Sequence, residues 1–477
     1  MNNALYHAGV ARADITPPVG IRLIGYAVRE GFSRAVAEPL TVTALALRGA
    51  SDEQTVVLLA VDVAVMMLEH AAQVRAACGA ALGVPASHIL INCNHTHSSP
   101  ALPGYISYGP PEQLQMEEEY AALFLEKCVQ ACREAVAALR PARLAAGWGE
   151  CAGNINRRQK SPEGTMLMGE DPNGVCDRSV GVLRVDDLDG QPIAVAFRYS
   201  CHTVTLGPKT NVISPDWAGP ARGVVESALD CPSLFLQGCA GNINPATGIG
   251  QDADTAPHFD DDQKRLGHSV GGEVLRVAQS LRTHRRRARP RLVQSVAVYW
   301  LYEYEPIAPG EAGQVTVRER EMQLPLAPFP SLEEVRRERE EWAAKLREAR
   351  ERGDSEWVLN PLIRFDRWAQ KRLDAAQQGP NPMTVTFPIQ TIALGDINLV
   401  ALPFEPMAET GLALRETLGE HTFVLGYSNG MVSYLPTPQT SDEGGMEARL
   451  GYKNYQVPAE VPGSWEPQIR AALAHNF

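Results

Sequence analysis

The chain alternates short apolar runs with longer segments of helical periodicity. The apolar runs have the length of buried strands, and the first periodic segment ends at Gly83 with Pro85 beyond it, which are usual helix stop signals. We predict strands at residues 40–47, 55–65, 88–93, 142–148, 180–185, 193–199, 233–237, 383–394 and 397–402, and helices near 68–82, 117–139, 216–229 and 262–282. Strands that alternate with helices indicate an α/β fold, with β-sheets flanked by helices.

Residues 331–378 interrupt this alternation with two helical segments, the first of them highly charged. Ser331 and Glu334 have the spacing of a capping box, in which two side chains satisfy backbone N–H groups at a helix start. Because strands are predicted again directly afterwards, we interpret the segments as a helical hairpin inserted into the main fold. No low-complexity linker marks a boundary, and we predict a single domain over residues 1–477.

Composition and charge place the chain among ordinary globular proteins, with 44% hydrophobic and 21% charged residues. The net charge of −12 argues against a nucleic-acid partner, because phosphate binding needs a clustered basic surface. One short basic run contains Arg285, Arg286, Arg287, Arg289 and Arg291. We interpret it as a solvated linker after a helix.

The sequence carries no sign of membrane insertion or secretion. No apolar stretch approaches the roughly 20 residues that a spanning helix needs, and the chain lacks the basic start and apolar run of a secretory signal. We therefore predict no integral membrane segment and a cytoplasmic location, with oligomerisation left open. The nine cysteines contain no Cys-x-x-Cys pair, which indicates buried free thiols in a reducing compartment.

The sequence Cys-Ala-Gly-Asn-Ile-Asn occurs twice, at residues 151–156 and 239–244, each time after a predicted strand. The residues that flank the two copies do not match. We therefore interpret them as two similar Gly-Asn turns, in preference to a duplicated domain.

Histidines follow two of the predicted strands. His95 and His97 lie in a polar loop, where they are either loop polar groups or metal ligands on one face of an extended segment. His202 lies beyond the strand predicted at 193–199, and Asp216 supplies a carboxylate that can orient an imidazole or line a cavity. Spacing alone leaves these alternatives open.

Six segments of the chain occur in the order found in one known family. They are residues 9–17 (Gly-Val-Ala-Arg-Ala-Asp-Ile-Thr-Pro), 25–27 (Gly-Tyr-Ala), 95–98 (His-Thr-His-Ser), 154–157 (Asn-Ile-Asn-Arg), 182–185 (Val-Leu-Arg-Val) and 190–193 (Gly-Gln-Pro-Ile). Along nearly all of its length the chain resembles the neutral/alkaline non-lysosomal ceramidase family. The resemblance implies the α/β catalytic domain of that family.

The resemblance also implies a zinc site. In that family, zinc is held by the first histidine of the His-Thr-His loop, a distant histidine, a glutamate and a tyrosine. The matching positions are His95, His202, Glu405 in Leu-Pro-Phe-Glu-Pro-Met, and Tyr434 at the end of Ser-Asn-Gly-Met-Val-Ser-Tyr. Without the resemblance, Glu405 would be interpreted as a helix-start acid and Tyr434 as a packed aromatic residue.

The chain departs from the family pattern in three places. The family has Ala-Gly-Asp-Val-Ser-Pro, with a serine once assigned a nucleophilic role, where residues 240–245 read Ala-Gly-Asn-Ile-Asn-Pro, and Asn244 cannot be that nucleophile. Met446 stands where the family has the tyrosine of Tyr-Glu-Gly-Ala. Members of the family commonly continue into an immunoglobulin-like C-terminal domain, whereas the sequence here ends at Phe477, and we therefore expect a catalytic domain alone and a substrate other than membrane-borne ceramide.

We therefore predict a zinc-dependent hydrolase that cleaves the amide bond of a small N-acyl compound with a zinc-activated water. The predicted catalytic residues are His97, Arg157 and Asp216, and the predicted substrate-binding residues are Asn156, Asn242 and Asn244. His97 would move protons or support the developing charge, and Arg157 would bind a polar or anionic group of the substrate.

Two other hypotheses start from the same residues. The zinc site can instead serve the hydrolysis of a glycosidic, ester or lactone bond, with Asn242 and Asn244 bonded to sugar hydroxyls. The second hypothesis is a non-catalytic ligand-binding protein on the same fold, which the presence of all four candidate zinc ligands disfavours.

Overall fold

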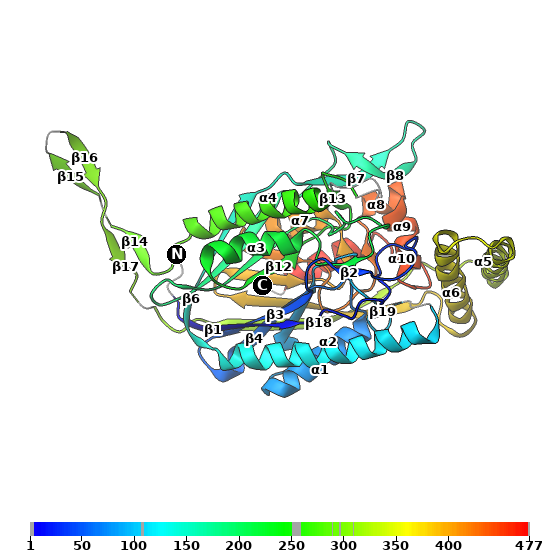
Figure 1. Ribbon diagram of the computed structural model, residues 1–477, viewed down its shortest axis with the longest axis horizontal. Coiled ribbons are helices and arrows are strands. Elements are labelled where there is room, and N and C mark those ends of the chain that lie inside the picture. The colour runs from blue at the N-terminus through cyan, green and yellow to red at the C-terminus, as the bar shows by residue number, and fades with distance from the viewer. Residues whose placement is uncertain are drawn as a thin grey trace.

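The computed structural model describes residues 4–105, 109–249, 259–288, 290–294, 297–308 and 310–475. Among these residues an eight-stranded sheet forms the centre of the molecule (Figure 1), in the order β12-β10-β9-β6-β1-β3-β4-β5. Its strands are β1 (Tyr6–Asp14), β3 (Thr41–Arg48), β4 (Thr55–Val61), β5 (Ile89–Cys93), β6 (Arg140–Glu150), β9 (Ser179–Asp187), β10 (Pro192–Tyr199) and β12 (Ser233–Gln237). The β4–β5 and β10–β12 pairs are parallel, and the other pairs are antiparallel.

A second sheet packs on one face of the first. Its strands are β18 (Val315–Pro325), β19 (Thr384–Leu394), β20 (Ile397–Ala401) and β22 (Thr422–Leu425). Strands of both sheets contribute to one apolar core, for example Leu45 and Leu58 from the first and Leu399 and Phe423 from the second. The central strands are therefore apolar on both faces, which is why they read as continuous hydrophobic runs in the sequence.

Helices cover the other face of the eight-stranded sheet in two pairs. The pairs are α1 (Leu68–Leu82) with α2 (Pro111–Ala137), and α3 (Ala218–Leu229) with α4 (Phe259–Ser280). In Figure 1 the first pair lies below the sheet and the second above it, since the sheet is strongly twisted. The first pair shares a core with β3 and β4, and the second with β9, β10 and β12.

The twist brings the two edge strands of the large sheet together. Asn92 in β5 and Gln237 in β12 exchange hydrogen bonds, with the Gln237 backbone N–H donating to Asn92 Oδ1 (2.7 Å) and Asn92 Nδ2 donating to the Gln237 carbonyl (3.2 Å). The loops that follow β5, β10 and β12 therefore converge, as expected where parallel strands end at one edge.

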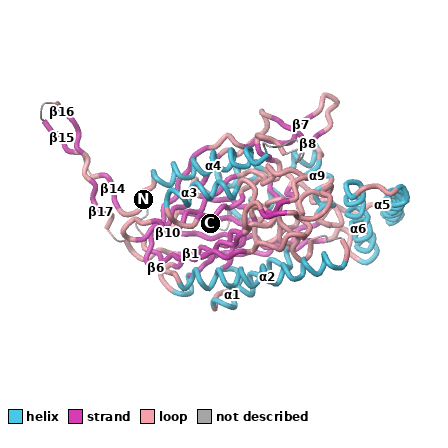
Figure 2. The backbone as a smooth tube through the Cα atoms, in the orientation of Figure 1, coloured by secondary structure: helices cyan, strands magenta, loops and turns pink. Residues whose placement is uncertain are grey.

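The predicted helical hairpin is confirmed as α5 (Leu332–Arg352) and α6 (Glu356–Gln378). It is inserted between β18 and β19, which pair in antiparallel register along their whole length, from Val315 opposite Leu394 to Pro325 opposite Thr384. The capping box at Ser331 and Glu334 is present. Figure 2 shows the two helices at one end of the molecule. That the whole chain is a single domain stays a prediction.

The repeated Cys-Ala-Gly-Asn-Ile-Asn segments turn out to be partners. The first copy runs into β7 (Asn154–Lys160) and the second into β13 (Ile243–Pro245), and these two strands pair antiparallel, with Ile243 opposite Asn156. β8 (Met166–Asp171) completes this small sheet. The interpretation as two separate turns is therefore incomplete, because each turn leads into a strand that pairs with the other copy.

The interpretation of the basic run as a linker is wrong. Its first three arginines form β14 (Arg285–Arg287), which pairs with β17 (Tyr304–Pro306) in a projecting arm. The arginines are solvent-exposed, as expected, and Arg289 lies outside the described residues. The strands β1, β18 and β15 (Arg291–Gln294) with β16 (Val298–Leu301) were also not predicted.

The remaining described elements are short or lie in the last quarter of the chain. They are β2 (Ala35–Val36), β11 (Val212–Ile213), β21 (Glu405–Pro406), β23 (Tyr434–Leu435), α7 (Ala408–Leu418), α8 (Pro438–Glu443), α9 (Met446–Arg449), α10 (Gly451–Asn454), α11 (Trp465–Ala474) and two 3-10 turns at Asp52–Gln54 and Ala86–His88. None of the helices within the described ranges has both the length and the apolar character needed to span a bilayer.

Candidate metal centre

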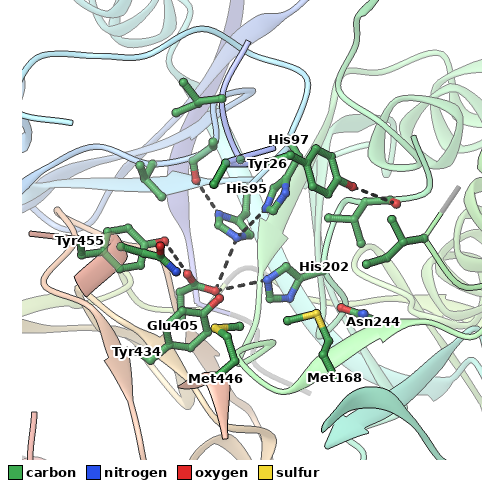
Figure 3. A pocket seen from close by; sticks show the side chains of 18 of the residues that line it. Tyr26, His95, His97, Met168, His202, Asn244, Glu405, Tyr434, Met446 and Tyr455 are labelled. Carbon is green, nitrogen blue, oxygen red and sulfur yellow. Dashed lines mark hydrogen bonds and ion pairs between the residues drawn. The ribbon is translucent and has the colours of Figure 1, made fainter. Parts of the chain in front are cut away.

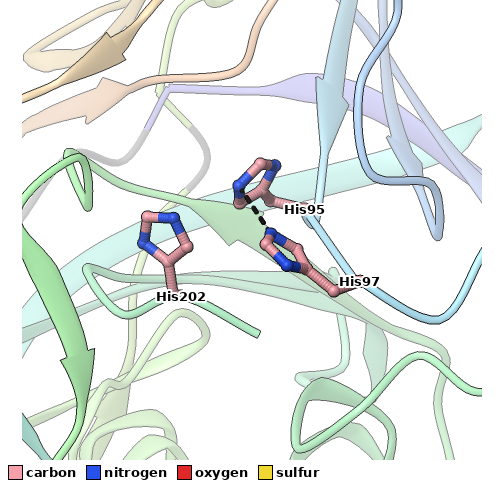
Figure 4. A group of neighbouring side chains, drawn as sticks. All are labelled: His95, His97 and His202. Atoms are coloured by element: carbon pink, nitrogen blue, oxygen red, sulfur yellow. Dashed lines mark hydrogen bonds between the residues drawn. The ribbon is translucent and has the colours of Figure 1, made fainter. Parts of the chain in front are cut away.

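Three histidines meet where the loops after β5 and β10 run side by side (Figure 4). Thr96 and Thr203 form a parallel bridge between the loops, and the backbone N–H of His97 donates to the Thr203 carbonyl at 3.3 Å. One nitrogen from each of His95, His97 and His202 lies within 4.8 Å of the others. The fold therefore brings together two histidine-containing loops that are more than 100 residues apart in the sequence.

The local backbone holds the histidine loop in an unusual conformation. His95 has a φ of 64°, a left-handed value that costs a non-glycine residue about 1–3 kcal/mol. The loop is held by Thr96, whose hydroxyl donates to the Ser214 carbonyl at 2.7 Å. Gly25 packs against the His97 ring so closely that a Cβ there would lie 2.4 Å from it. The Gly-Tyr-Ala segment thus leaves room for His97.

Glu405 adds a carboxylate to the three imidazoles. It lies in β21 directly opposite Tyr434 of β23. Its Oε2 is 3.5 Å from His95 Nε2 and 3.3 Å from His202 Nε2. The hydroxyl of Tyr427 donates to the same oxygen at 3.1 Å, and the hydroxyl of Tyr455 donates to Oε1. Figure 3 shows Glu405 between Tyr455 and the histidines.

Arg157 is the central cation beside this cluster. Its Nε donates to Glu447 at 3.0 Å, its Nη2 to the Tyr434 hydroxyl at 3.2 Å, and its Nη1 to Asn244 Oδ1 at 3.2 Å. Nη1 also lies 3.2 Å from His202 Nε2. These contacts fix the side chains around His202 and account for most of the donors of the guanidinium.

Backbone carbonyls determine which nitrogen of two imidazoles carries hydrogen. His95 Nδ1 lies 2.8 Å from the Ala64 carbonyl, and His202 Nδ1 lies 2.8 Å from the Ala240 carbonyl. A carbonyl only accepts, so each Nδ1 is the donor. In a neutral ring the Nε2 atom then has a lone pair, and both Nε2 atoms lie within 3.5 Å of Glu405 Oε2.

Burial keeps these rings neutral at neutral pH. It lowers the pKa of His95 to about 4, and it lowers the pKa values of His97 and His202 as well. Burial acts to raise the pKa of Glu405, but His95, His202 and Arg157 outweigh it and lower that pKa to about 2. The cluster at neutral pH is therefore neutral imidazoles around an ionised carboxylate.

This donor set has the chemistry and spacing of a divalent metal site. Neutral imidazole nitrogens and a carboxylate are usual zinc ligands, and ligand atoms about 2.0–2.1 Å from a tetrahedral ion lie about 3.3 Å apart. The separations here are 3.2 Å from His97 Nε2 to His95 Nε2, 3.5 Å from His95 Nε2 to Glu405, and 3.3 Å from His202 Nε2 to Glu405. A cation would offset the repulsion between lone pairs and carboxylate.

The cluster forms the polar part of a cavity of about 230 Å³ (Figure 3). Apolar side chains such as Ile24, Val204 and Met446 make up much of the remaining wall. Arg364 of α6 also lines the cavity, and its Nη1 donates to the Tyr105 hydroxyl at 2.8 Å. The inserted helical hairpin therefore contributes a positive charge to the site.

Most of the predicted site residues converge on this cavity. The lining includes His95, His97, His202, Glu405, Tyr434, Arg157 and Asn244. Their convergence supports a common site, while their individual roles stay predictions. The resemblance assigns Tyr434 as the fourth zinc ligand, but its hydroxyl is bonded to Arg157. His97 has a nitrogen at ligand spacing. Tyr434 and His97 are therefore alternative candidates for the fourth ligand.

Three predicted residues lie outside the cavity lining. Asp216 is buried and accepts backbone N–H groups of Thr205, Leu206 and Trp217 (2.7–3.2 Å), so it shapes the chain after His202. Asp216 neither lines the cavity nor accepts a hydrogen bond from an imidazole of the described residues, and its catalytic role stays a prediction. Ser214-Pro215-Asp216 is the turn that begins α3, and the carboxylate is used there.

The two asparagines outside the cavity also hold the backbone. Asn156 Nδ2 donates to the Val175 carbonyl at 2.8 Å, and Asn242 bonds to Glu409 and the Ala408 backbone N–H, both at 2.9 Å. Their predicted contact with substrate has no support from this placement, because a backbone carbonyl and the start of α7, rather than a ligand, use their amides.

Two lining residues were missed by the sequence analysis. Tyr455 lies just after α10, and no motif marks it. Arg364 lies on a charged helix that reads as solvated, and only the packing of α6 against the site reveals its position. A screen for tyrosines downstream of Met446 would have found Tyr455, because Met446 stands where the family has a tyrosine.

Comparison with known proteins gives matches in sequence. A profile of the family described as neutral/alkaline non-lysosomal ceramidase, N-terminal, matches residues 6–245. The chain is 28% identical to neutral ceramidase B of Dictyostelium discoideum over 176 residues, which cover 34% of this chain and 24% of that protein. It is 24% identical to the neutral ceramidase of Pseudomonas aeruginosa over 255 residues, covering 50% of this chain and 37% of that protein. The matched part thus spans less than half of either relative.

Solved structures share the fold. The crystal structure of neutral ceramidase from Pseudomonas aeruginosa matches with a TM-score of 0.67 at 18% identity, over 99% of this chain and 74% of that chain. A ceramidase complexed with C2 gives the same TM-score at 17% identity. The profile match covers half of the chain and contains both histidine loops of the site. On that sequence match, this chain belongs to the neutral/alkaline non-lysosomal ceramidase family.

Proposed function

We propose that this chain is a zinc-dependent hydrolase that cleaves the amide bond of a small N-acyl compound. The observation that carries the proposal is the set of Nε2 and carboxylate atoms 3.2–3.5 Å apart at the polar side of the cavity. Family membership supports amide hydrolysis, since the named relatives are ceramidases. Bound zinc supplies a Lewis acid and lowers the pKa of a coordinated water to near 7.

His97 is the residue best suited to move a proton. His95 and His202 each have Nδ1 committed to a backbone carbonyl, whereas His97 Nδ1 finds no hydrogen-bond partner among the described residues. His97 Nε2 points into the cluster. It can therefore take up the proton lost by the attacking water and return it to the leaving amine.

No protein nucleophile is needed for this chemistry. Asn244 stands where the family has its serine, and its Oδ1 accepts a hydrogen bond from Arg157. An amide side chain cannot attack a carbonyl under these conditions, so water is the nucleophile. Arg157, with its donors committed to Glu447, Tyr434 and Asn244, positions these side chains beside His202.

The cavity favours a small substrate with a polar or anionic group. Its volume of about 230 Å³ lies below the roughly 300–1,000 Å³ typical of pockets for drug-sized ligands. Arg364 is buried at its wall and carries a positive charge. We assign Arg364 to recognition of that polar group, because the donors of Arg157 are committed to Glu447, Tyr434 and Asn244.

Metal removal tests the proposal. Hydrolysis of short N-acyl amides should stop after chelation and return on addition of zinc, and Glu405→Gln and His95→Asn should abolish it. His70→Asn, which changes a buried histidine of α1 outside the cavity, is the matched control and should remain active. Turnover that persists in the chelator would contradict zinc dependence.

The same assay separates the other bond types. The glycosidic alternative relied on Asn242 and Asn244, and only Asn244 lines the cavity. We therefore expect N-acyl amides to be cleaved faster than glycosides, esters or lactones of similar size. A glycoside or lactone that is the better substrate would keep the zinc site and replace the amide.

We also propose a reducing, cytoplasmic location. All nine cysteines are free thiols, and eight of them are buried. Fractionation of cells that express the tagged chain tests this, and recovery from an oxidising compartment would contradict it.

A further inference from the structure

An arm that leaves the body of the molecule (Figure 1) is formed by β14, β15, β16 and β17, within residues 285–288, 290–294 and 297–306. β14 pairs with β17 next to the body, and β15 pairs with β16 at the tip. Arg143 of β6 holds the base, since its guanidinium donates to the carbonyls of Thr283 (3.3 Å) and Ile307 (3.0 Å). The arm is thus a two-stranded ribbon that is fixed at one end.

Both faces of the tip carry large apolar side chains. Leu292 lies opposite Trp300, and Val293 lies opposite Tyr299. Because successive side chains of a strand point to opposite faces, these two pairs occupy different faces. Trp300 is 56% exposed and Val298 is 64% exposed. An isolated two-stranded ribbon is marginally stable in water, so this tip needs a surface that covers it.

The arm has the opposite charge to the body. Residues 285–306 contain five arginines and two glutamates, in a chain whose net charge is −12. Arg286 pairs with Glu305 at 2.5 Å, and Arg287 lies over the Tyr302 ring at 3.2 Å from its centroid. The residues outside the arm therefore have a net charge that is more negative than the −12 of the whole chain. A second copy of this chain offers the arm a surface of complementary charge.

A hollow of about 440 Å³ lies beside the base of the arm. Leu144, Leu281 and Ile397 provide apolar wall, and Arg287 of β14 borders it. Acidic groups stand at its edge, since Asp396 borders it and Glu420 lies next to the lining residue His421 and is 87% exposed. The hollow has an apolar floor that suits the apolar and aromatic side chains of the tip, and acidic groups at its edge that suit Arg291 of β15.

The position of the arm argues against a lipid surface as its partner. The elements that line the cavity, namely β8, α6, α9 and α10, lie at the opposite end of the long axis in Figure 1. A bilayer that held the aromatic tip would therefore lie far from the cavity. Basic aromatic segments do bind anionic membranes, so this alternative is included in the test.

We propose that the arm docks on a second copy of this chain, with the tip of each arm covering the hollow beside the base of the other. A two-fold dimer is closed by such a reciprocal contact, because tip and hollow lie on one end of the same chain. This inference does not depend on the proposed activity. Catalytic cavities would remain open at the two outer ends of the dimer.

The mass of the full chain in solution tests the proposal. Light scattering after gel filtration should give twice the chain mass for the unchanged protein and the chain mass for Trp300→Glu. Trp357→Glu is the matched control, because Trp357 is 40% exposed on α6 at the other end of the molecule, and it should remain dimeric. Equal melting temperatures for the two variants would show that the arm variant is folded.

A charge variant adds a second readout. Arg286→Glu with Arg291→Glu should weaken the dimer at least tenfold at low ionic strength, with a smaller effect at high ionic strength. An unchanged protein that is monomeric at 100 µM, or a Trp300→Glu variant that stays dimeric, would overturn the proposal. So would a monomer that binds vesicles rich in phosphatidylserine only when Trp300 is present.

Discussion

Three neutral imidazoles and one ionised carboxylate share a buried space at the candidate metal centre. His95, His202 and Glu405 are each no more than 3% exposed. Burial favours the neutral form of an imidazole, whereas the carboxylate stays ionised because cationic and hydrogen-bonding groups surround it. The histidines are thus kept in the neutral state that a metal requires. Protonation of these buried rings at low pH would therefore destabilise the folded state.

This makes the metal-free protein sensitive to acid. An unfolded histidine has a pKa near 6.5, and burial lowers that of His95 to about 4, so between these pH values the unfolded chain binds a proton that the folded chain does not. Stability is therefore complete above pH 6.5 and falls towards pH 4, with a loss of about 2 kcal/mol expected from His95 alone between pH 7 and pH 5. Urea denaturation at pH 7 and pH 5 measures the loss. His95→Asn should reduce the loss, whereas His475→Asn, at an exposed position, should leave it as it is.

Tyr455 holds the other oxygen of Glu405 and should tune metal affinity. Its hydroxyl donates to Oε1, and removal of a hydrogen-bond partner of a ligand typically weakens metal binding 10–100-fold. Tyr455→Phe should show this loss in a zinc competition titration. The neighbouring Tyr452→Phe, which packs on Trp368, is the control. Equal zinc affinities for the two variants would show that Tyr455 does not support the site.

At the scale of elements, a buried ion pair ties α3 to the end of β4. Arg222 donates two hydrogen bonds of 2.8 Å to Asp62, and Asn94 Nδ2, next to His95, donates to the same carboxylate at 2.8 Å. The ion pair therefore links α3, which packs on the β9–β10–β12 half of the sheet, to the loop that carries His95 after β5. The seam between β5 and β12 needs this link because those strands do not pair with each other.

Removing one partner should destabilise the fold strongly. Arg222→Met leaves a buried carboxylate without its cation, which typically costs about 3–5 kcal/mol. Arg276→Met, which breaks the solvent-exposed pair of Arg276 with Glu273 on α4, should have little effect on stability. Thermal denaturation compares the two variants, and similar melting temperatures would contradict a structural role for Asp62.

The elements were predictable where hydrophobic pattern decides structure. β12 and α1 begin and end at the predicted residues, whereas α2 begins at Pro111, six residues before its predicted start. The arm was missed because its exposed aromatic and basic residues have no core to face, so the pattern resembles a linker. Pairing of β7 with β13 depends on contacts between distant segments, which periodicity does not report.

The site was predictable only in part. Without the family resemblance, the sequence spacing of His95, His202 and Glu405 gives no reason to place them in one site. Asp216 was misplaced because its carboxylate serves the turn before α3, and a turn-forming aspartate and a catalytic one look alike in sequence. Arg364 reaches the cavity through the packing of an inserted helix, and this depends on tertiary structure alone.

At the scale of the whole molecule, the elements β8, α6, α9 and α10, which contribute lining residues to the cavity, lie at the end of the long axis opposite the arm (Figure 1). The two ends differ in chemistry. One gathers imidazole and carboxylate donors in a buried space, and the other exposes apolar and basic side chains on a ribbon. Variants at either end should therefore leave the property of the other end unchanged.

The central claim is that the histidine cluster binds one metal ion, and the zinc content of the purified chain tests it most directly. Mass spectrometry of chelator-treated protein reconstituted with zinc and then dialysed should find one zinc per chain. His202→Asn and Glu405→Gln should lose that zinc, while His70→Asn should keep it. A chain that retains no zinc, or that retains it equally in His202→Asn, would contradict the account.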